Sequence, residues 1–274
     1  MEKYNGQKYV YLCEDSLEGI LSAVYRAYEE RHGHRANEIR IRRTGFNQEL
    51  FCEYIYVETD LERAVKVART VQREISGQAY GFLQRAAVSC FPEKADAIYR
   101  FIIYGLHKGE KILDCLTLPF MQTLYEIEKK VGNEICHWKE FLRFQELADG
   151  SLFARINPKS DLLPWLADHF SDRYSGEDWI IADTVHRTVL IHRREKGCLY
   201  AAMEEVDFDE LSLQYSAEEK DMQRLWKLFV DTIAIKERKN LDLQRQLLPL
   251  WFRRYMEEYK ISLSSAEDCD TINK

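Results

Sequence analysis

The sequence predicts an α+β protein, in which an antiparallel sheet module follows a largely helical middle region and precedes two C-terminal helices. Three patterns predict this class. Short β-type runs separated by one helical segment give the order ββαβββ between 141 and 203. Apolar residues keep helical spacing almost throughout 76–136, and two further amphipathic segments follow at 219–235 and 241–259.

The N-terminal part begins with a strand at Tyr9–Cys13. The capping box of 15–18 then starts a helix that reaches about Arg31, because an N-cap oxygen is followed by a glutamate three residues later. The remaining elements expected here are strands at 38–43 and 50–58 around a turn at 44–47, and a helix over 61–75 that begins at a second capping motif, 59–62.

The middle region reads as a series of helices with breaks near Gly77, Pro92 and Gly109. Pro92 suits a helix start, where its missing N–H costs nothing. A helix over 118–131 should end at Gly132, and another from Glu134 leads into the sheet module.

The sheet module can be assigned in order. Asp149-Gly150 predicts a hairpin turn, because both central positions of a tight hairpin favour positive φ. Ser160 or Asp161 is expected to cap the single helix, whose apolar face covers the sheet. The predicted strands are 141–147, 152–156, 179–182, 187–191 and 198–203.

An acidic connection over 206–216 leads to the two last helices. The first places one apolar stripe on its surface, formed by Met222, Leu225, Trp226, Phe229 and Ile233, and the second is kinked at Pro249. We expect an N-terminal region over 1–136, the sheet module with its C-terminal helices over 137–262, and a disordered tail over 263–274.

Composition excludes several classes of protein. No apolar run is long enough to cross a bilayer, and the N-terminus lacks the pattern of a secretory signal, so we predict a cytoplasmic protein without a membrane partner. The seven cysteines include no C-x-x-C pair, and the dinucleotide and triphosphate fingerprints are absent. The sequence therefore predicts no cofactor and no metal.

The net charge of −7 is concentrated in one stretch. Residues 203–221 hold eight acidic residues and one lysine, and the net charge of this stretch therefore equals that of the whole chain. Basic clusters remain at 31–43 and 187–196, and such clusters attract phosphate when they are not simply solvated faces.

Polar residues within the sheet module and last helices form the candidate site. Arginine offers forked donors that suit phosphate, and a tryptophan beside arginines can stack on a base. The candidate anion-binding or nucleic-acid-binding residues are Arg143, Arg155, Arg173, Arg187, Arg238 and Trp251. Asp183 and His169 are the candidates for general acid/base catalysis.

A structural explanation competes with each assignment. Asp183 can bind the amides of its own turn and pair with Arg187, and His169 and Arg173 can complement the dipole of the helix that they end.

Four segments carry a family resemblance: YLCEDSLEGILSAVYRAY near the N-terminus, HWKEFLRFQEL in the centre, WLADHFSDRY with WIIADTVHR, and LWKLFVDTIAIKERKNLDLQRQLLPLWF. Together they resemble a family of DNA metabolism or DNA repair proteins of unknown biochemical function that is encoded beside a radical SAM protein. The C-terminal part is also similar to a domain fused to uracil-DNA glycosylase-like proteins.

The resemblance implies a role in DNA repair with a radical SAM partner. This chain lacks the C-x-x-x-C-x-x-C motif, so any iron–sulfur chemistry belongs to that partner. Three functions stay open: a nucleic-acid-binding or accessory protein, an enzyme acting on a nucleotide or base through Asp183 or His169, and a protein–protein adaptor.

Overall fold

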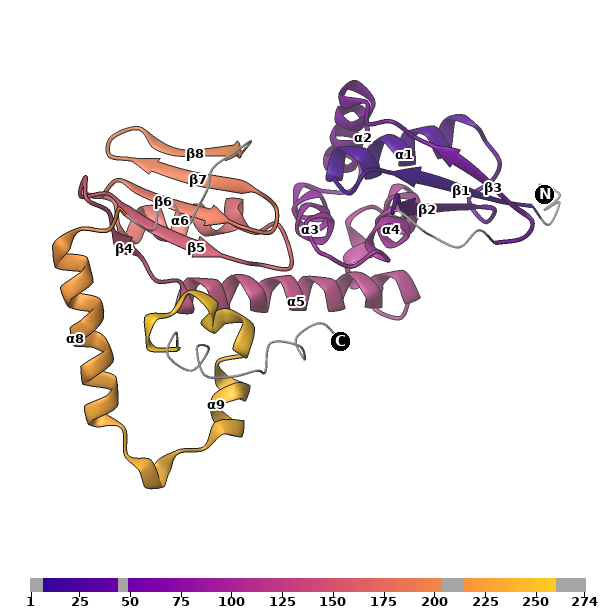
Figure 1. Cartoon of the computed structure of the whole chain (residues 1–274). Helices are drawn as coiled ribbons and strands as arrows, with labels where there is room; N and C mark the ends of the chain where they lie inside the picture. Colours follow the sequence, from indigo (N-terminus) through magenta and orange to yellow (C-terminus); the bar gives the residue numbers. More distant parts are fainter. Residues whose placement is uncertain (1–6, 44–48, 204–213, 260–274) are drawn as a thin grey trace. The chain divides into compact units, whose positions relative to one another are not determined.

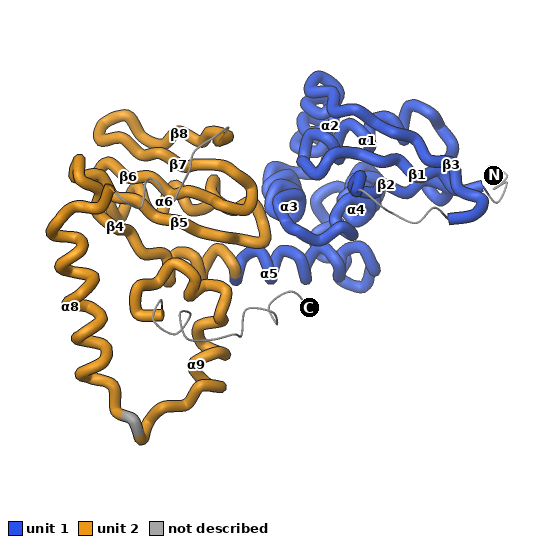
Figure 2. Tube along the Cα trace, viewed as in Figure 1, with its two compact units in different colours: residues 1–133 blue, residues 134–274 orange. Residues whose placement is uncertain are grey.

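The computed structural model describes residues 7–43, 49–203 and 214–259. The chain divides into two compact units, 1–133 and 134–274, and the boundary falls within the long helix α5, Pro119–Phe141 (Figure 2). Each unit is described by itself below.

Unit 1 is built on a three-stranded parallel sheet of order β2-β1-β3 (Figure 1). The strands are β1 (Lys8–Cys13), β2 (Asn37–Ile41) and β3 (Cys52–Tyr56). Helix α1 (Leu17–Glu29) connects β1 to β2 and begins one residue later than the predicted capping box, because the N-cap is Ser16, whose hydroxyl accepts a hydrogen bond from the Gly19 amide.

Between β3 and α5, the described part of unit 1 contains four helical segments at boundaries that agree with the predicted breaks: α2 (Leu61–Glu74), α3 (Gly77–Ala87), α4 (Lys94–Lys108) and the 3-10 helix η1 (Gly109–Asp114). The predicted break at Gly132 is wrong, because α5 continues through it to Phe141. Helix α4 is fixed by Lys94, a buried lysine whose ammonium group pairs with Asp15 and donates to the carbonyls of Ala87 and Ser89.

Unit 2 contains a five-stranded sheet in sequential order. Its strands are β4 (Gln145–Glu146), β5 (Leu152–Ile156), β6 (Trp179–Asp183), β7 (Thr188–Arg193) and β8 (Gly197–Ala202), with helix α6 (Leu163–Arg173) between β5 and β6. The α+β class and the order ββαβββ are confirmed. The sheet is mixed rather than antiparallel, because α6 returns the chain to the starting edge and β6 therefore runs parallel to β5.

Two local assignments in this module also change. The first strand was predicted over 141–147, but α5 extends to Phe141 and β4 begins only at Gln145, so Arg143 lies in neither element. The helix continues because Trp138 and Phe141 pack against Phe252, at ring-centroid distances of 4.8 and 5.6 Å. The hairpin turn at Asp149-Gly150 is present, with Gly150 at a φ of 81°.

The two faces of this sheet bury different residues. Phe153, Ala182 and Val189 form a cluster with Leu147 on one face. Ile156 and Ile181 alternate with them and therefore lie on the other face, where they are fully buried. Helix α6 packs against the sheet and buries Leu166 and Phe170.

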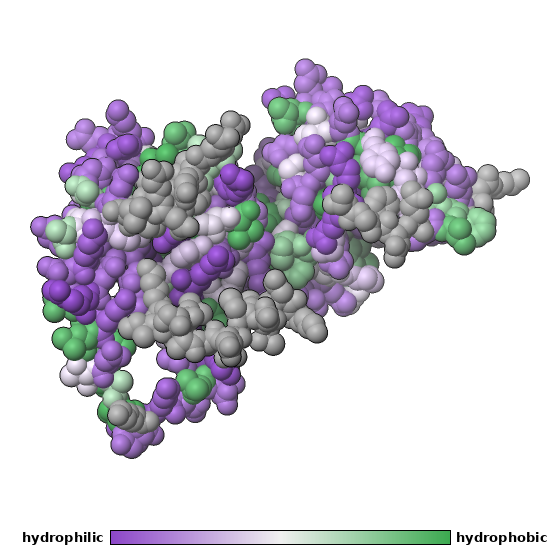
Figure 3. All heavy atoms as spheres, viewed as in Figure 1, coloured by the Kyte–Doolittle hydropathy of each residue, from purple (hydrophilic) through white to green (hydrophobic). Residues whose placement is uncertain are grey.

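The C-terminal segment of unit 2 differs most from its prediction. Helix α8 (Ala217–Ile233) has no buried residue, and the five stripe residues from Met222 to Ile233 are 44–62% exposed. Apolar side chains therefore reach the surface along this helix (Figure 3). The predicted last helix is broken at Pro249 into α9 (Leu241–Leu247) and the 3-10 helices η3 (Leu250–Tyr255) and η4 (Glu257–Tyr259); another 3-10 helix, η2 (Lys236–Arg238), precedes α9.

Some predicted features cannot be compared with the structure. The turn at 44–47, most of the acidic connection at 206–216 and the tail at 263–274 lie outside the described residues. Among the helices that are described, none is both long and apolar enough to cross a membrane.

We expect Gly19→Ala to lower the stability of unit 1 by about 1–3 kcal/mol, the usual cost of forcing an extra methyl into a packed site. A Cβ on Gly19 would lie 2.7 Å from the Glu14 carbonyl oxygen. Thermal unfolding measures the effect, and Gly81→Ala is the control. No atom lies within 4 Å of a Cβ on Gly81, so this variant should gain about 0.5–1 kcal/mol. Equal melting temperatures for the two variants would contradict the close approach at Gly19.

Candidate functional site

The candidate site lies at the carboxyl ends of the parallel strands β5 and β6. In open sheets with parallel strands, ligands bind beyond these ends, because the following loops converge there. Ile156 and Asp183 are register partners, and both the amide and the hydroxyl of Thr184 bond to the Ile156 carbonyl oxygen, at 3.0 and 3.1 Å. The segments after the two strands are therefore held side by side.

Asp183 organises the turn that follows β6. Its side chain is fully buried, and Oδ1 accepts hydrogen bonds from the amides of Val185 and His186, at 2.8 and 3.0 Å. Its Oδ2 lies 2.6 Å from Nδ1 of His186. The carboxylate thus fixes both the turn backbone and the orientation of the imidazole, which is itself only partly buried.

Asp161 approaches the same place from the loop before α6. The prediction that it caps this helix is wrong, because the N-cap position is Leu162 and no side-chain cap bond forms. Instead, Asp161 Oδ2 accepts a hydrogen bond from the Tyr200 hydroxyl of β8, at 3.0 Å. The other oxygen, Oδ1, is buried and has no hydrogen-bond partner among the described residues. Asp161, Asp183 and His186 offer ligand-type atoms that all lie within 4.8 Å of one another.

Electrostatics in this cluster follow from burial and from the two neighbouring carboxylates. Burial raises the pKa of Asp161, and the hydrogen bond from Tyr200 only partly opposes it. Burial lowers the pKa of His186, but the hydrogen bond and charge of Asp183, with the charges of Asp161 and Glu134, outweigh it, and the net shift is upward. Burial and the nearby carboxylates raise the pKa of Tyr200 to about 12.

A second group of side chains lies at the same edge of the sheet, and it consists of cationic groups packed against aromatic rings. The guanidinium groups of Arg155 and Arg254 lie 5.0 and 5.6 Å from the ring centroid of Tyr255, and the Lys159 ammonium lies 5.0 Å from that of Trp251. The Tyr255 hydroxyl is 3.2 Å from the Thr184 hydroxyl, which places the ring next to the β6 turn. We call Arg155, Lys159, Trp251, Arg254 and Tyr255 the cation–aromatic strip.

The strip is held by buried neighbours. Trp251 packs edge-on against Trp138 of α5, with ring centroids 5.9 Å apart. The loop that carries Lys159 is anchored by Glu134, a buried carboxylate that accepts the Lys159 amide at 2.6 Å and whose pKa is raised by burial. The rings and cations are therefore positioned by the core of unit 2.

The structure brings together only some of the residues predicted from sequence. Arg155 and Trp251 belong to the strip, and Asp183 and Arg187 both lie at the carboxyl edge. Asp183 binds its turn amides as the structural explanation expected, but its side-chain partner is His186 and not Arg187. Arg187 is exposed in the turn, with a φ of 55°.

The other predicted residues lie elsewhere. His169 and Arg173 are in the second half of α6, toward the opposite edge of the sheet, and burial and two nearby cations lower the pKa of His169. Arg143 donates to the carbonyls of Glu140 and Leu142 at the end of α5. Arg238 is exposed in η2.

Sequence reasoning missed Asp161 and Lys159 as members of the site. A usable signal existed, because both follow a predicted strand directly, as site residues in parallel sheets do. That signal required β5 and β6 to be assigned as parallel.

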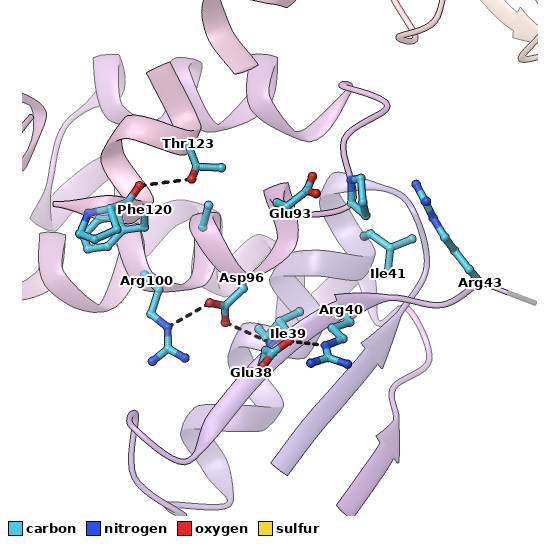
Figure 4. A pocket seen from close by; sticks show the side chains of 13 residues that line it. Glu38, Ile39, Arg40, Ile41, Arg43, Glu93, Asp96, Arg100, Phe120 and Thr123 are labelled. Carbon is cyan, nitrogen blue, oxygen red and sulfur yellow. Dashed lines mark hydrogen bonds and ion pairs between the residues drawn. The ribbon is translucent and has the colours of Figure 1, made fainter. Parts of the chain in front are cut away.

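Unit 1 contains a separate cavity of about 710 Å³ (Figure 4). It is lined by β2, the start of α4 and the start of α5, and it includes three arginines, two of which belong to the basic cluster at 31–43. Arg100 is bonded to Asp96 and to the carbonyls of His34 and Asn37, and Arg40 pairs with Glu38. Because Arg40 and Arg100 already have acidic partners and only Arg43, which donates to the Cys90 carbonyl, has none among the described residues, the cavity offers less to an anionic ligand than the edge of unit 2.

Comparison with known proteins adds one family. A family model described as a domain of unknown function (DUF4130) matches residues 92–258. No curated protein matches the chain. A solved structure titled as a DHH domain from a member of the s1p family of ribosomal proteins aligns with 69% of this chain and 74% of its own, at 9% identity and a TM-score of 0.32. A likeness at that level carries no argument about fold or function.

We expect Asp183→Ala to destabilise unit 2 by on the order of 2–4 kcal/mol, because it leaves two turn amides and the His186 ring without their buried acceptor. Chemical denaturation followed by tryptophan fluorescence measures the loss. Asp172→Ala is the matched control, since Asp172 is exposed on α6, and it should change stability by less than about 0.5 kcal/mol. Similar effects from the two variants would contradict the structural role of Asp183.

Proposed function

The chain belongs to the DUF4130 family, and we propose that its second unit binds nucleic acid through the cation–aromatic strip, as an accessory protein in DNA repair or DNA metabolism. The observation that carries the proposal is the placement of three cations against two aromatic rings at one edge of a sheet.

The chemistry of the strip suits single-stranded or unpaired nucleic acid. Aromatic rings stack on bases of any sequence, while lysine and arginine bind the phosphates between them. Lys159 and Arg254 are exposed, and neither pairs with a carboxylate among the described residues. Their charge therefore stays available to a phosphate.

The acidic net charge does not oppose this assignment. The excess of acidic residues is confined to 203–221, and the rest of the chain is neutral overall. Binding of phosphate depends on the local electrostatic potential, because salt at moderate ionic strength screens charges that are more than about 10 Å away.

The accessory part of the proposal has a different support. The sequence resembles a family encoded beside a radical SAM protein, and the apolar stripe of α8 stays 44–62% exposed, although Trp226 donates a hydrogen bond to Glu258 of η4. Contiguous exposed apolar surface is typical of a protein-binding site. We propose that the radical SAM protein docks on this face.

A second candidate is an enzyme acting on a nucleotide or base. The hydrogen bond between His186 Nδ1 and the Asp183 carboxylate favours it, because a buried carboxylate that orients an imidazole is a common arrangement for proton transfer. In this function Asp183 is a positioning residue and His186, rather than His169, exchanges the proton.

We predict that Lys159→Gln and Arg254→Gln each weaken binding of single-stranded DNA about three- to five-fold near 0.15 M salt. Each should also reduce the slope of log affinity against log salt by about 0.7, the value for one lost phosphate contact. Fluorescence anisotropy over a salt series, with single-stranded and lesion-bearing duplex DNA, measures both quantities.

The control for this experiment is Arg224→Gln, which removes the same charge from an arginine that pairs with Asp221 on α8. Its slope should equal that of the wild type. Wild-type affinity that does not fall with added salt, or equal slopes for all three variants, would refute phosphate binding by the strip.

For the partner surface, we predict that Leu225→Glu and Phe229→Glu weaken the complex with the purified radical SAM protein at least about ten-fold, as expected for apolar anchors. Both side chains are more than half exposed, so the fold should be retained. Biolayer interferometry measures the affinity, and Arg224→Glu on the same helix is the control. A stable complex in a protein that binds no DNA would instead support the adaptor function.

A further inference from the structure

We propose that Asp161, Asp183 and His186 form a binding site for one divalent cation at the carboxyl edge of β5 and β6. The residues come from three segments: the loop before α6, the end of β6 and the turn after it. Their ligand atoms lie within 4.8 Å of one another, a separation that a single ion can bridge with small side-chain adjustments. The inference does not depend on nucleic-acid binding.

The donor set indicates the class of ion. Carboxylate oxygens suit Mg²⁺ and Mn²⁺, and an imidazole nitrogen suits Zn²⁺ and other first-row ions. Two carboxylates with one imidazole therefore favour Mn²⁺ or Zn²⁺ over Ca²⁺, which binds oxygen ligands alone.

An independent observation concerns Asp161. Tyr200 holds one of its oxygens, and the other is buried without a hydrogen-bond donor among the described residues. A buried carboxylate oxygen with no partner is costly, and fewer than one polar group in ten is left in this state in native proteins. A bound cation would supply the missing partner and compensate two carboxylates at once.

The surrounding bonds already orient the remaining ligands. Two backbone amides occupy Oδ1 of Asp183, which leaves Oδ2 beside the His186 ring as the oxygen that can bind an ion. When an ion binds at both Oδ2 and Nδ1, the proton of their present hydrogen bond is released to solvent. Outer contacts of this kind hold metal ligands in place in known sites.

The test uses the full chain after treatment with a chelator and dialysis. Titration with Mn²⁺ by electron paramagnetic resonance, and with Zn²⁺ by calorimetry, should give one site per chain. Asp161→Asn should still accept the Tyr200 hydrogen bond, and it and His186→Gln should each raise the dissociation constant at least about ten-fold. Asp178→Asn, at the opposite edge of the sheet, should bind like the wild type.

A second measurement avoids the variants. In the wild-type protein, substoichiometric Mn²⁺ should broaden the ring resonances of His186 more strongly than those of His169, which lies in the second half of α6. Absence of binding tighter than about 1 mM, or affinities that are equal in all the variants, or broadening of His169 that equals or exceeds that of His186, would overturn the proposal. All of these measurements omit DNA, so a negative result leaves the proposed nucleic-acid binding unaffected, and the reverse also holds.

Discussion

The parallel pairing of β5 with β6 is the constraint on which the candidate site depends. Helix α6 crosses from the end of one strand to the start of the other, and the two strands therefore finish at the same edge. Thr184 extends this pairing by bonding twice to the Ile156 carbonyl oxygen. If β6 ran in the other direction, Asp183 would lie at the opposite edge from Asp161 and Lys159, and no cluster would form.

The two faces of the same sheet supply two different chemistries at that edge. The Asp183 side chain lies on the face of the sheet that also buries Ile156 and Ile181, and there its carboxylate lies close to Asp161 and His186. The Arg155 side chain lies on the same face of the sheet as Phe153, and its guanidinium group lies over the Tyr255 ring. The alternation of side chains along a strand thus separates acidic and imidazole ligands from cations that would compete for them.

Much of the fold could be predicted from sequence, because helix caps, the Asp149-Gly150 turn and hydrophobic periodicity are local signals. The order ββαβββ followed from them, but the direction of β6 did not, since alternation is the same in parallel and antiparallel strands. Asp161 was assigned to a helix cap because an aspartate just before a helix usually has that role. The stripe on α8 could be placed from sequence, but its exposure could not, since the spacing of apolar residues does not indicate whether the covering surface belongs to the same chain.

The uncovered face of α8 also has a consequence for the protein in the cell. A protein that exposes several large apolar side chains to water tends to aggregate, and it is recognised by chaperones and proteases. If the proposed partner covers this face, synthesis of the two proteins in matched amounts would lower that tendency. Genes that are transcribed together provide such balance, which is the expression pattern that the proposed docking on α8 would favour.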